Sequence, residues 1–290
     1  MTDYIRNRIR QIECLPTFPY VVAEVMRIID DPASSASDLV RHMDPSLVGE
    51  VLRAANSAYF GKKNFRRIAN VEQAVVTIGY HTLSSIVLRM PLVSIIDGQD
   101  VPFDRRGFVL HSLSCAVFAR AVGAFLGVGN VNTVYISGIL HDVGIIIMHQ
   151  FFKEECRRVN NLRRQERLDR PAAEKAVFGT DHASIGSMVL ELWDIPETII
   201  ESVRLHHLRK EICEGEEQYA VWLANSLAKQ IDSGKDLVDF ETFFRKQREF
   251  LEWEMPERYL VGHDVDLFEK AYDQLKEIED FLEGSRWGEG

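Results

Sequence analysis

Cysteine is scarce in this chain, and no two cysteines are spaced for a shared site. The four that occur, Cys14, Cys115, Cys156 and Cys213, lie far apart, and none belongs to a Cys-X-X-Cys pair. This pattern argues against the disulfide framework of a small secreted protein and is typical of a reducing compartment. We therefore expect a cytoplasmic protein.

Long apolar runs and glycine-rich phosphate loops are missing as well. The chain starts with the polar segment MTDYIRNRIRQ. No apolar run approaches the roughly 18 residues of a membrane helix, so we expect neither a membrane span nor a signal peptide. Excess positive charge is also absent, since 34 basic and 44 acidic residues give a net charge of −10. Broad binding to nucleic acids or anionic membranes is therefore not expected.

Helical periodicity, in contrast, runs through nearly the whole chain, and strand-like alternation is hard to find. The segment 154–170 is rich in charges of both signs and is expected to be a solvated helix face or a loop. The pattern predicts an all-α protein. The expected helices cover residues 20–29, 37–43, 47–55, 71–78, 81–92, 108–126, 131–152, 182–193, 196–207 and 217–231, with a closing amphipathic helix near 267–282.

A domain boundary is expected where turn-forming residues interrupt this pattern. The run Asp97-Gly98-Gln99-Asp100 is followed by Pro102, and such a cluster marks a loop. With 290 residues, of which 46% are hydrophobic, the chain can form one large domain or two smaller ones. We predict an N-terminal helical subdomain at 1–100, a second helical subdomain at 101–235 and a C-terminal helical extension at 236–290.

Five histidines and one aspartate between residues 111 and 207 form short groups within the predicted helices. Imidazoles and a carboxylate are typical ligands of a first-row transition metal. A carboxylate can also bridge two ions, and water held between them can attack a phosphoester. The group predicts a metal site if several helices aim these side chains at one point. The residues are His111, His141, Asp142, His182, His206 and His207.

Each of these residues also has an ordinary structural interpretation. The His141-Asp142 doublet could be a structural pair, although an ionised Asp142 in so apolar a helix is costly unless it is paired or metal-bound. His182 follows Asp181, a good N-cap, and by itself is typical of a capping or core histidine. The His206-His207 pair lies at a predicted helix C-terminus, where histidine is favourable in any case.

Three further residues bear on this group. Gly144 lowers the stability of its helix, and the close approach of another helix or of a substrate explains it best. His111 is the weakest candidate taken alone, and Cys115, one turn later, is expected to be a small core residue. Outside the group, Asn56 is expected to cap or end a helix.

The order of a single histidine, a His-Asp doublet, a later histidine and a His-His pair resembles the HD superfamily of metal-dependent phosphohydrolases. Three segments of the N-terminal half make the resemblance more specific. They are Leu15-Pro16-Thr17-Phe18-Pro19, ANSAYFG at 55–61 and Val71-Glu72-Gln73-Ala74-Val75. This series, with Ile78-Gly79, resembles the HDOD family, a bacterial signalling module related to the cyclic-di-GMP-cleaving HD-GYP proteins. The resemblance covers residues 15 to 228. It implies a helical bundle with an N-terminal helical subdomain and a C-terminal HD-like subdomain.

The resemblance implies that the five histidines and Asp142 are metal ligands. It also indicates which functional residues of the family this chain lacks. The final metal-binding aspartate of the family would fall at Asn225, whose amide oxygen can coordinate but brings no negative charge. The lysine of the HD-GYP relatives is replaced by Ile145, and their Gly-Tyr-Pro segment does not follow His207. Because charges that stabilise a transition state are worth several kcal/mol, we expect no efficient hydrolysis of cyclic dinucleotides.

Two functions stay open. The first is a bacterial signalling module that binds a signalling protein or a small phosphorylated ligand and keeps a divalent transition metal, iron or manganese, as a mono- or dinuclear centre with little or no turnover. The second is a metal-dependent phosphohydrolase acting on a nucleotide or another phosphoester, with Asp142 and His141 as catalytic residues. A nucleic-acid-associated regulator fits the charge of −10 least, and no membrane partner is expected.

Overall fold

The computed structural model describes residues 103–208, 215–231 and 269–276, together with residues 5, 7–9, 52, 56, 68 and 73. Every regular element among these residues is a helix, so the predicted all-α fold class is confirmed. The helices expected between residues 20 and 92 and the boundary at 97–100 fall mostly or wholly outside the described residues. The division into three parts therefore stays a prediction.

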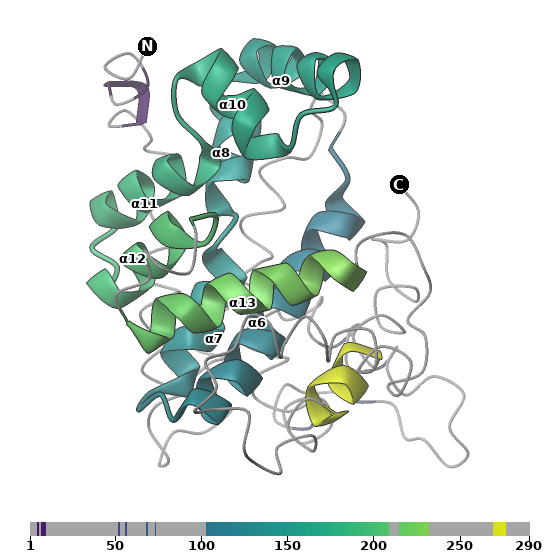
Figure 1. Ribbon diagram of the computed structural model, residues 1–290, viewed down its shortest axis with the longest axis vertical. Coiled ribbons are helices and arrows are strands. Elements are labelled where there is room, and N and C mark those ends of the chain that lie inside the picture. The colour runs from purple at the N-terminus through teal and green to yellow at the C-terminus, as the bar shows by residue number, and fades with distance from the viewer. Residues whose placement is uncertain are drawn as a thin grey trace.

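The described helices are numbered α6 to α13 in Figure 1, and residues 269–276 are also helical. The expected helix at 131–152 differs from the prediction, because it is divided in two at residues 141 and 142. The charged segment at 154–170, expected as a helix face or a loop, is largely helix. The bounds are α6 Arg105–Leu126, α7 Val131–Leu140, α8 Val143–Phe151, α9 Lys153–Glu166, α10 Arg170–Phe178, α11 His182–Leu192, α12 Glu197–Leu205 and α13 Glu216–Ile231.

The long helix α6 is the centre of the described part. It begins at an N-cap, Asp104, whose side chain accepts a hydrogen bond from the Gly107 amide, and it ends at Gly127 in the left-handed conformation. Most of its residues are buried. It packs against α7 and α13, and α12 packs on both of these helices. Figure 1 shows α13 lying across α6 and α7.

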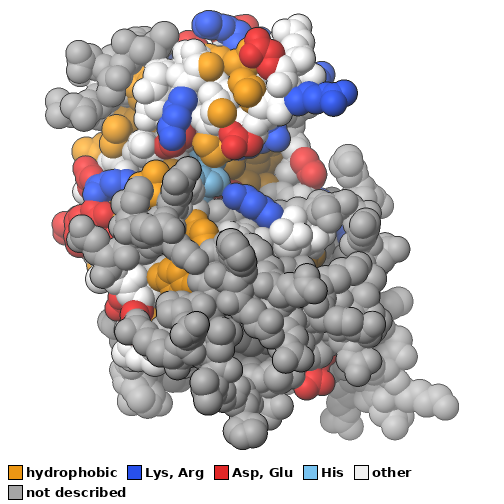
Figure 2. All heavy atoms as spheres, in the orientation of Figure 1, with side chains coloured by type: hydrophobic (Ala, Val, Ile, Leu, Met, Phe, Trp, Pro, Cys, Tyr) orange, Lys and Arg blue, Asp and Glu red, His pale blue; other side chains and the backbone are white. Residues whose placement is uncertain are grey.

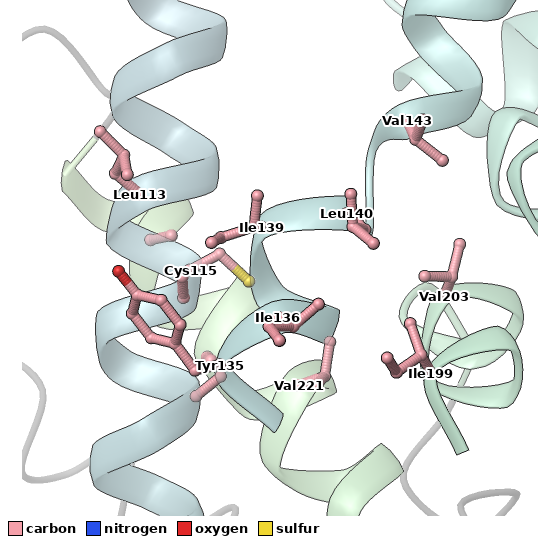
Figure 3. Close-up of a cluster of buried hydrophobic side chains, with 14 of the residues drawn as sticks. Leu113, Cys115, Tyr135, Ile136, Ile139, Leu140, Val143, Ile199, Val203 and Val221 are labelled. Carbon is pink, nitrogen blue, oxygen red and sulfur yellow. The ribbon is translucent and has the colours of Figure 1, made fainter. Parts of the chain in front are cut away.

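The core fills the space between α6, α7, α12 and α13. Figure 3 shows Cys115 of α6 and Ile136 of α7 within one cluster with Ile199 of α12 and Val221 of α13. All four side chains are almost completely buried. Cys115 is thus the small core residue that the sequence predicts. The packed core fixes the positions of the helices that carry the histidines.

Two glycines allow helices to touch backbone to backbone. A Cβ on Gly138 of α7 would lie 2.6 Å from the Cα of Ala116 on α6. A Cβ on Gly144 of α8 would collide with the carbonyl oxygen of His182 and come within 2.8 Å of the Gly186 amide, both on α11. The predicted explanation of Gly144, the close approach of another helix, is confirmed. This contact brings the start of α11 against the His141-Asp142 doublet.

The charged helix α9 covers the outside of the fold. Only Cys156 and Val159 of its side chains are buried, and the upper region of Figure 2, where α9 and α10 lie, shows basic and acidic side chains intermixed at the surface. Glu154 and Glu155 in the first turn, with Arg163 and Arg164 in the last, complement the helix dipole. The prediction of a solvated, mixed-charge segment is confirmed.

Two helical stretches are long and apolar enough to cross a membrane, contrary to the expectation that the chain has no such segment. They are Arg105–Leu126, with a mean hydropathy of 1.6, and Val131–Phe151, with 1.5. Within the fold, 78% and 83% of these apolar windows are buried. Burial against other helices is typical of the core helices of a soluble protein, and it accounts for their composition.

Asn56 joins two parts of the chain that are distant in sequence. Its Nδ2 donates to the carbonyl oxygens of Leu52, at 2.6 Å, and Ile68, at 2.9 Å, and its Oδ1 accepts from the Ile68 amide at 2.8 Å. The bond to Leu52 lies within its own helical turn. The two bonds to Ile68 make Asn56 a bridge between segments, a role that the sequence expectation of a cap did not include.

Candidate metal centre

The structure brings the six histidine and aspartate candidates together from five helices. His111 lies on α6, and His141 and Asp142 lie in the break between α7 and α8. His182 is the first residue of α11, and His206 and His207 end α12. Five of the six are buried, and His207 is partly buried. Their convergence is a feature of the structure, whereas their role as metal ligands stays a prediction.

Asp142 stands at the centre, and each of its carboxylate oxygens faces a different pair of imidazoles. Oδ2 lies 3.5 Å from His111 Nε2 and 3.3 Å from His141 Nε2. Oδ1 lies 3.1 Å from His182 Nε2 and 3.4 Å from His206 Nε2. The carboxylate therefore divides the site into two parts.

We call these parts half-site A and half-site B. Half-site A consists of His111, His141 and Asp142, and half-site B of Asp142, His182, His206 and His207. Within each, one candidate ligand atom per residue lies within 4.8 Å of all the others. Asp142 belongs to both, so a carboxylate bridge between two ions is sterically available.

The break between α7 and α8 is what lets neighbouring residues serve one site. Adjacent side chains in an unbroken helix diverge by about 100°. Here α7 ends at Leu140 and α8 starts at Val143. Asp142 occupies the N-cap position of α8, yet its side chain makes no capping hydrogen bond. Its carboxylate is free to face the histidines, and the prediction of one continuous helix is corrected at this point.

Local hydrogen bonds fix the orientation of three imidazoles. His141 Nδ1 donates to the Gly138 carbonyl at 2.7 Å, and His206 Nδ1 donates to the Val203 carbonyl at 2.6 Å. In both cases a histidine at the end of a helix bonds the carbonyl three residues earlier. His182 Nδ1 donates to a carboxylate oxygen of Glu174 at 2.5 Å. Since Nδ1 carries the hydrogen in the neutral rings of His141 and His206, their Nε2 atoms present lone pairs to the centre.

The centre gathers imidazole nitrogens that face one another. The Nε2 atoms of His111 and His141 lie 3.0 Å apart, and those of His182 and His207 lie 2.7 Å apart. His206 Nε2 is fully buried without a hydrogen-bond partner. Buried lone pairs around a carboxylate are costly unless a cation satisfies them. Nitrogen ligands about 2.1 Å from one ion and roughly at right angles lie about 3 Å apart, so this donor set fits a metal.

Burial and mutual contact set the protonation of most of the centre. Burial opposes ionisation of Asp142, but the neighbouring imidazoles, first that of His141, outweigh it and hold the pKa of the carboxyl well below its usual range. Burial lowers the pKa of His141 to about 4 and also lowers the pKa of His206 and His207. These three imidazoles are neutral at neutral pH, the form that binds metal.

His182 differs, because a second carboxylate lies behind it. Burial alone would lower its pKa, but Glu174 and Asp142 together raise the pKa to about 9. Glu174 itself is buried on α10, and its Oε2 also accepts from the His182 backbone amide at 2.9 Å. Its other oxygen lies 3.7 Å from Arg170 Nη1. The sequence analysis missed Glu174; the only available signal was an acidic residue among the buried residues Ala173, Val177 and Phe178.

Asn225 lies on α13 next to the centre, where the resemblance placed it. Its Nδ2 donates to the His206 carbonyl at 3.2 Å, which fixes the orientation of the amide. The side-chain oxygen is buried and has no hydrogen-bond partner. Ile145, at the position of the relatives' lysine, is buried on α8. The structure thus offers one neutral oxygen and no positive side chain at these two positions.

The start of α11, which carries His182, is held by a capping residue. Asp181 accepts from the Ser184 amide at 3.0 Å and pairs with Lys175 Nζ at 2.9 Å. Burial opposes ionisation of Asp181, but the Ser184 and Lys175 contacts outweigh it and lower the pKa of the carboxyl. The predicted N-cap role of Asp181 is confirmed.

Comparison with known proteins identifies the family. The sequence matches the HDOD domain over residues 15–208. The chain belongs to the HDOD domain family. This confirms the resemblance found in the sequence, and the matched range lies inside the range that the motifs indicated.

Individual relatives are distant. The chain is 24% identical over 200 residues to an uncharacterised protein of Treponema pallidum (strain Nichols), and the match covers 68% of this chain but only 38% of that relative. An HDOD domain protein of unknown function from Geobacter sulfurreducens has a TM-score of 0.69 at 22% identity, with 99% of both chains covered. A candidate phosphohydrolase from Shewanella amazonensis SB2B has a TM-score of 0.68 at 20% identity, with 98% of this chain and 97% of that chain covered. At these identities the structural neighbours show the fold.

Proposed function

We propose that this protein is a cytoplasmic bacterial signalling module whose HD-type half holds a divalent transition metal centre with little or no hydrolytic turnover. As a module it binds a signalling protein or a small phosphorylated ligand. The proposed metal centre is supported by the position of Asp142, whose two carboxylate oxygens face two different sets of histidine Nε2 atoms. The signalling part is supported by membership of the HDOD family.

The two half-sites are unequal in what they offer an ion. Half-site B has three imidazoles and one carboxylate oxygen, whereas half-site A has two imidazoles and the other oxygen. The set of two histidines and one carboxylate in half-site A is one that non-haem iron uses. The described residues therefore support firm binding in half-site B, weaker binding in half-site A, and iron or manganese as the ion. A bound ion would supply Lewis acidity toward a phosphoryl oxygen.

Weak turnover follows from charge and access. Two dications would share a single coordinating carboxylate, that of Asp142. Ile145 brings no positive charge that could bind a substrate phosphate. The side chains of His141, His182 and His206 are at most 1% exposed, and those of His111 and Asp142 are 11% and 10% exposed. On the face shown in Figure 2, only a small area of histidine reaches the surface. Most of the described side chains of the centre are therefore shielded from a substrate in solution.

A phosphohydrolase is the second candidate, because the shared carboxylate would hold two ions close together. The fold of the Shewanella amazonensis candidate phosphohydrolase, at a TM-score of 0.68, supports it by analogy only. In this case Asp142 and His141 would be catalytic residues, and the substrate would be a nucleotide or another phosphoester. Asp142 would hold the ions, and His141, fixed by its bond to Gly138, would keep its orientation during the reaction.

Metal analysis and turnover assays separate the two candidates. Protein purified anaerobically without a histidine tag is analysed for bound metal and then assayed on a panel of phosphoesters with added Mn²⁺ or Fe²⁺. Bound metal without efficient turnover is the result that the signalling module predicts. Clear turnover that Asp142→Ala abolishes would establish the phosphohydrolase instead, and protein without metal would refute the metal centre.

A further inference from the structure

Glu174 is a buried carboxylate to which the proposed function gives no role. Its side chain is 1% exposed. It comes from α10, a helix that contributes none of the six candidate ligands, and lies eight residues before His182. Burying a charged carboxylate is costly unless it is paired and hydrogen-bonded. The contacts of Glu174 therefore indicate what it stabilises.

Those contacts converge on His182. One carboxylate oxygen of Glu174 accepts from the backbone amide of His182 at 2.9 Å and from its Nδ1 at 2.5 Å. The remaining oxygen has Arg170 Nη1 at 3.7 Å, beyond hydrogen-bond distance. Glu174 thus holds both the main chain and the ring of one residue. Few other arrangements constrain an imidazole so completely.

The same imidazole has a carboxylate at each of its two nitrogens. Asp142 Oδ1 lies 3.1 Å from Nε2, on the side of the centre, and Glu174 lies at Nδ1, on the opposite side. Glu174 is therefore too far around the ring to be a ligand of an ion held at Nε2. It can act on such an ion only through His182. Among the described histidines of the centre whose Nδ1 contact is known, His141 and His206 have backbone carbonyls there instead.

The short helix α10 is built to keep Glu174 in this place. Asp169 caps its start by accepting from the Ala172 amide at 2.8 Å, and Gly179 ends it in the left-handed conformation with φ of 76°. The chain then reverses toward α11 within a few residues. Lys175, next to Glu174, pairs with Asp181, next to His182, at 2.9 Å. Two neighbouring contacts therefore tie α10 to the start of α11.

We propose that Glu174 is a positioning residue that aims His182 Nε2 at the metal centre and adds negative charge behind half-site B. This inference rests on the proposed metal centre. A carboxylate behind a ligating histidine fixes the ring and raises its basicity, and removing such a partner costs about 10–100-fold in metal affinity. Half-site B gains a second negative charge in this way, whereas the three residues of half-site A include no carboxylate besides the shared Asp142. Glu174 is thus a cause of the preference for half-site B.

The test compares three variants of the metal-free full-length chain in Mn²⁺ titrations. Glu174→Gln keeps the size and an acceptor oxygen but removes the charge, and Glu174→Asp keeps the charge but shortens the side chain. Glu191→Gln is the matched control, since Glu191 lies on α11 with His182, is half exposed and pairs with Arg204. Thermal unfolding of each metal-free variant separates an effect on the ion from an effect on the fold.

We expect Glu174→Gln to weaken the tightest Mn²⁺ site by about 10–100-fold. We also expect Glu174→Asp to bind more tightly than Glu174→Gln, and the control to match the wild type. The unfolding temperatures of the metal-free proteins should stay close together. If Glu174→Gln binds Mn²⁺ with wild-type affinity, this inference is wrong, although the metal centre stands. The same holds if Glu174→Asp binds Mn²⁺ no more tightly than Glu174→Gln. A wild-type protein that binds neither Mn²⁺ nor Fe²⁺ would overturn the metal centre and this inference together.

Discussion

Half-sites A and B share one carboxylate but differ in everything around it. Half-site B collects three imidazoles, and one of them is held by a second buried carboxylate, Glu174. Half-site A has two imidazoles, and its only carboxylate is the shared Asp142. The comparison teaches that the number of ligands does not decide the strength of a metal site by itself. The charges behind the ligands, and the local structure that aims them, decide it too.

The largest effect is expected from removing what the two half-sites share. Asp142→Ala takes one oxygen from each half-site, so we expect both to lose affinity by more than about 100-fold. Metal content measured by mass spectrometry after anaerobic purification should fall to background. Asp142→Asn, which keeps the size, is the matched variant and should also lose most of the metal. Retention of wild-type metal content by either variant would contradict a site built on this carboxylate.

Removing one histidine from each half-site should give different results. His182→Ala takes a ligand and the Glu174 contact from half-site B, so the tight site should weaken by at least about 100-fold. His111→Ala should leave the tight site unchanged and remove only the weaker one. Titrations that resolve two Mn²⁺ sites check both variants. Equal losses of the tight site in both variants would break the division into half-sites.

The packing of α8 on α11 places His182 of half-site B, so a change there should disturb this half-site first. Gly144→Ala puts a Cβ against the His182 carbonyl and the Gly186 amide, and such overpacking costs about 1–3 kcal/mol. Gly129→Ala is the control, because a Cβ at Gly129 meets nothing within 4 Å. Urea unfolding of the metal-free proteins measures the difference. Equal stability of the two variants would show that α8 and α11 approach less closely than described here.

Adding negative charge at Asn225 should raise the occupancy of the more weakly bound ion. Asn225→Asp replaces a neutral buried oxygen with a carboxylate next to His206. We expect the occupancy of the second ion to rise several-fold while the first ion stays bound. Metal stoichiometry at a limiting Mn²⁺ concentration gives the answer. An unchanged occupancy would mean that charge at this position does not limit the second ion.

The last prediction concerns pH. In the metal-free protein the Glu174 and Asp142 carboxylates overcome burial and raise the pKa of His182 to about 9, whereas burial lowers the pKa of His141 to about 4. An ion entering half-site B below pH 9 must therefore displace a proton from His182, while His141 has none to lose at neutral pH. The affinity of the tight site should rise with pH, by at most tenfold per unit, and level off near pH 9. Calorimetry in buffers of different ionisation enthalpy counts the released proton. Zero proton release at pH 7 would contradict this assignment.

Much of the site could be predicted from the sequence because its elements carry local signals. Asp181 before His182 is a helix start, and the paired histidines after 205 lie at a helix end. The helical period of the apolar residues gave the fold class. The family motifs predicted the candidate ligand set, including Asn225, which lies beside His206 in the structure.

What could not be predicted depends on contacts between distant segments. The interruption at residues 141 and 142 lies in an apolar stretch without proline, so the periodicity continues across it. Just after it, at Gly144, α8 packs closely against α11. Helix α10 has a start signal in Asp169 and Pro171, although it is not among the helices expected from the apolar periodicity. The contact between Glu174 and His182 exists only after α10 folds back on His182, so the sequence around Glu174 does not predict it.

A crystal of the metal-free protein soaked in Mn²⁺ and measured for anomalous scattering tests the central claim most directly. We expect a strong peak beside Asp142 Oδ1, in contact with His182, His206 and His207. A weaker peak should lie beside Oδ2, in contact with His111 and His141. Absence of anomalous density at Asp142, or ions bound only elsewhere on the chain, would contradict the account.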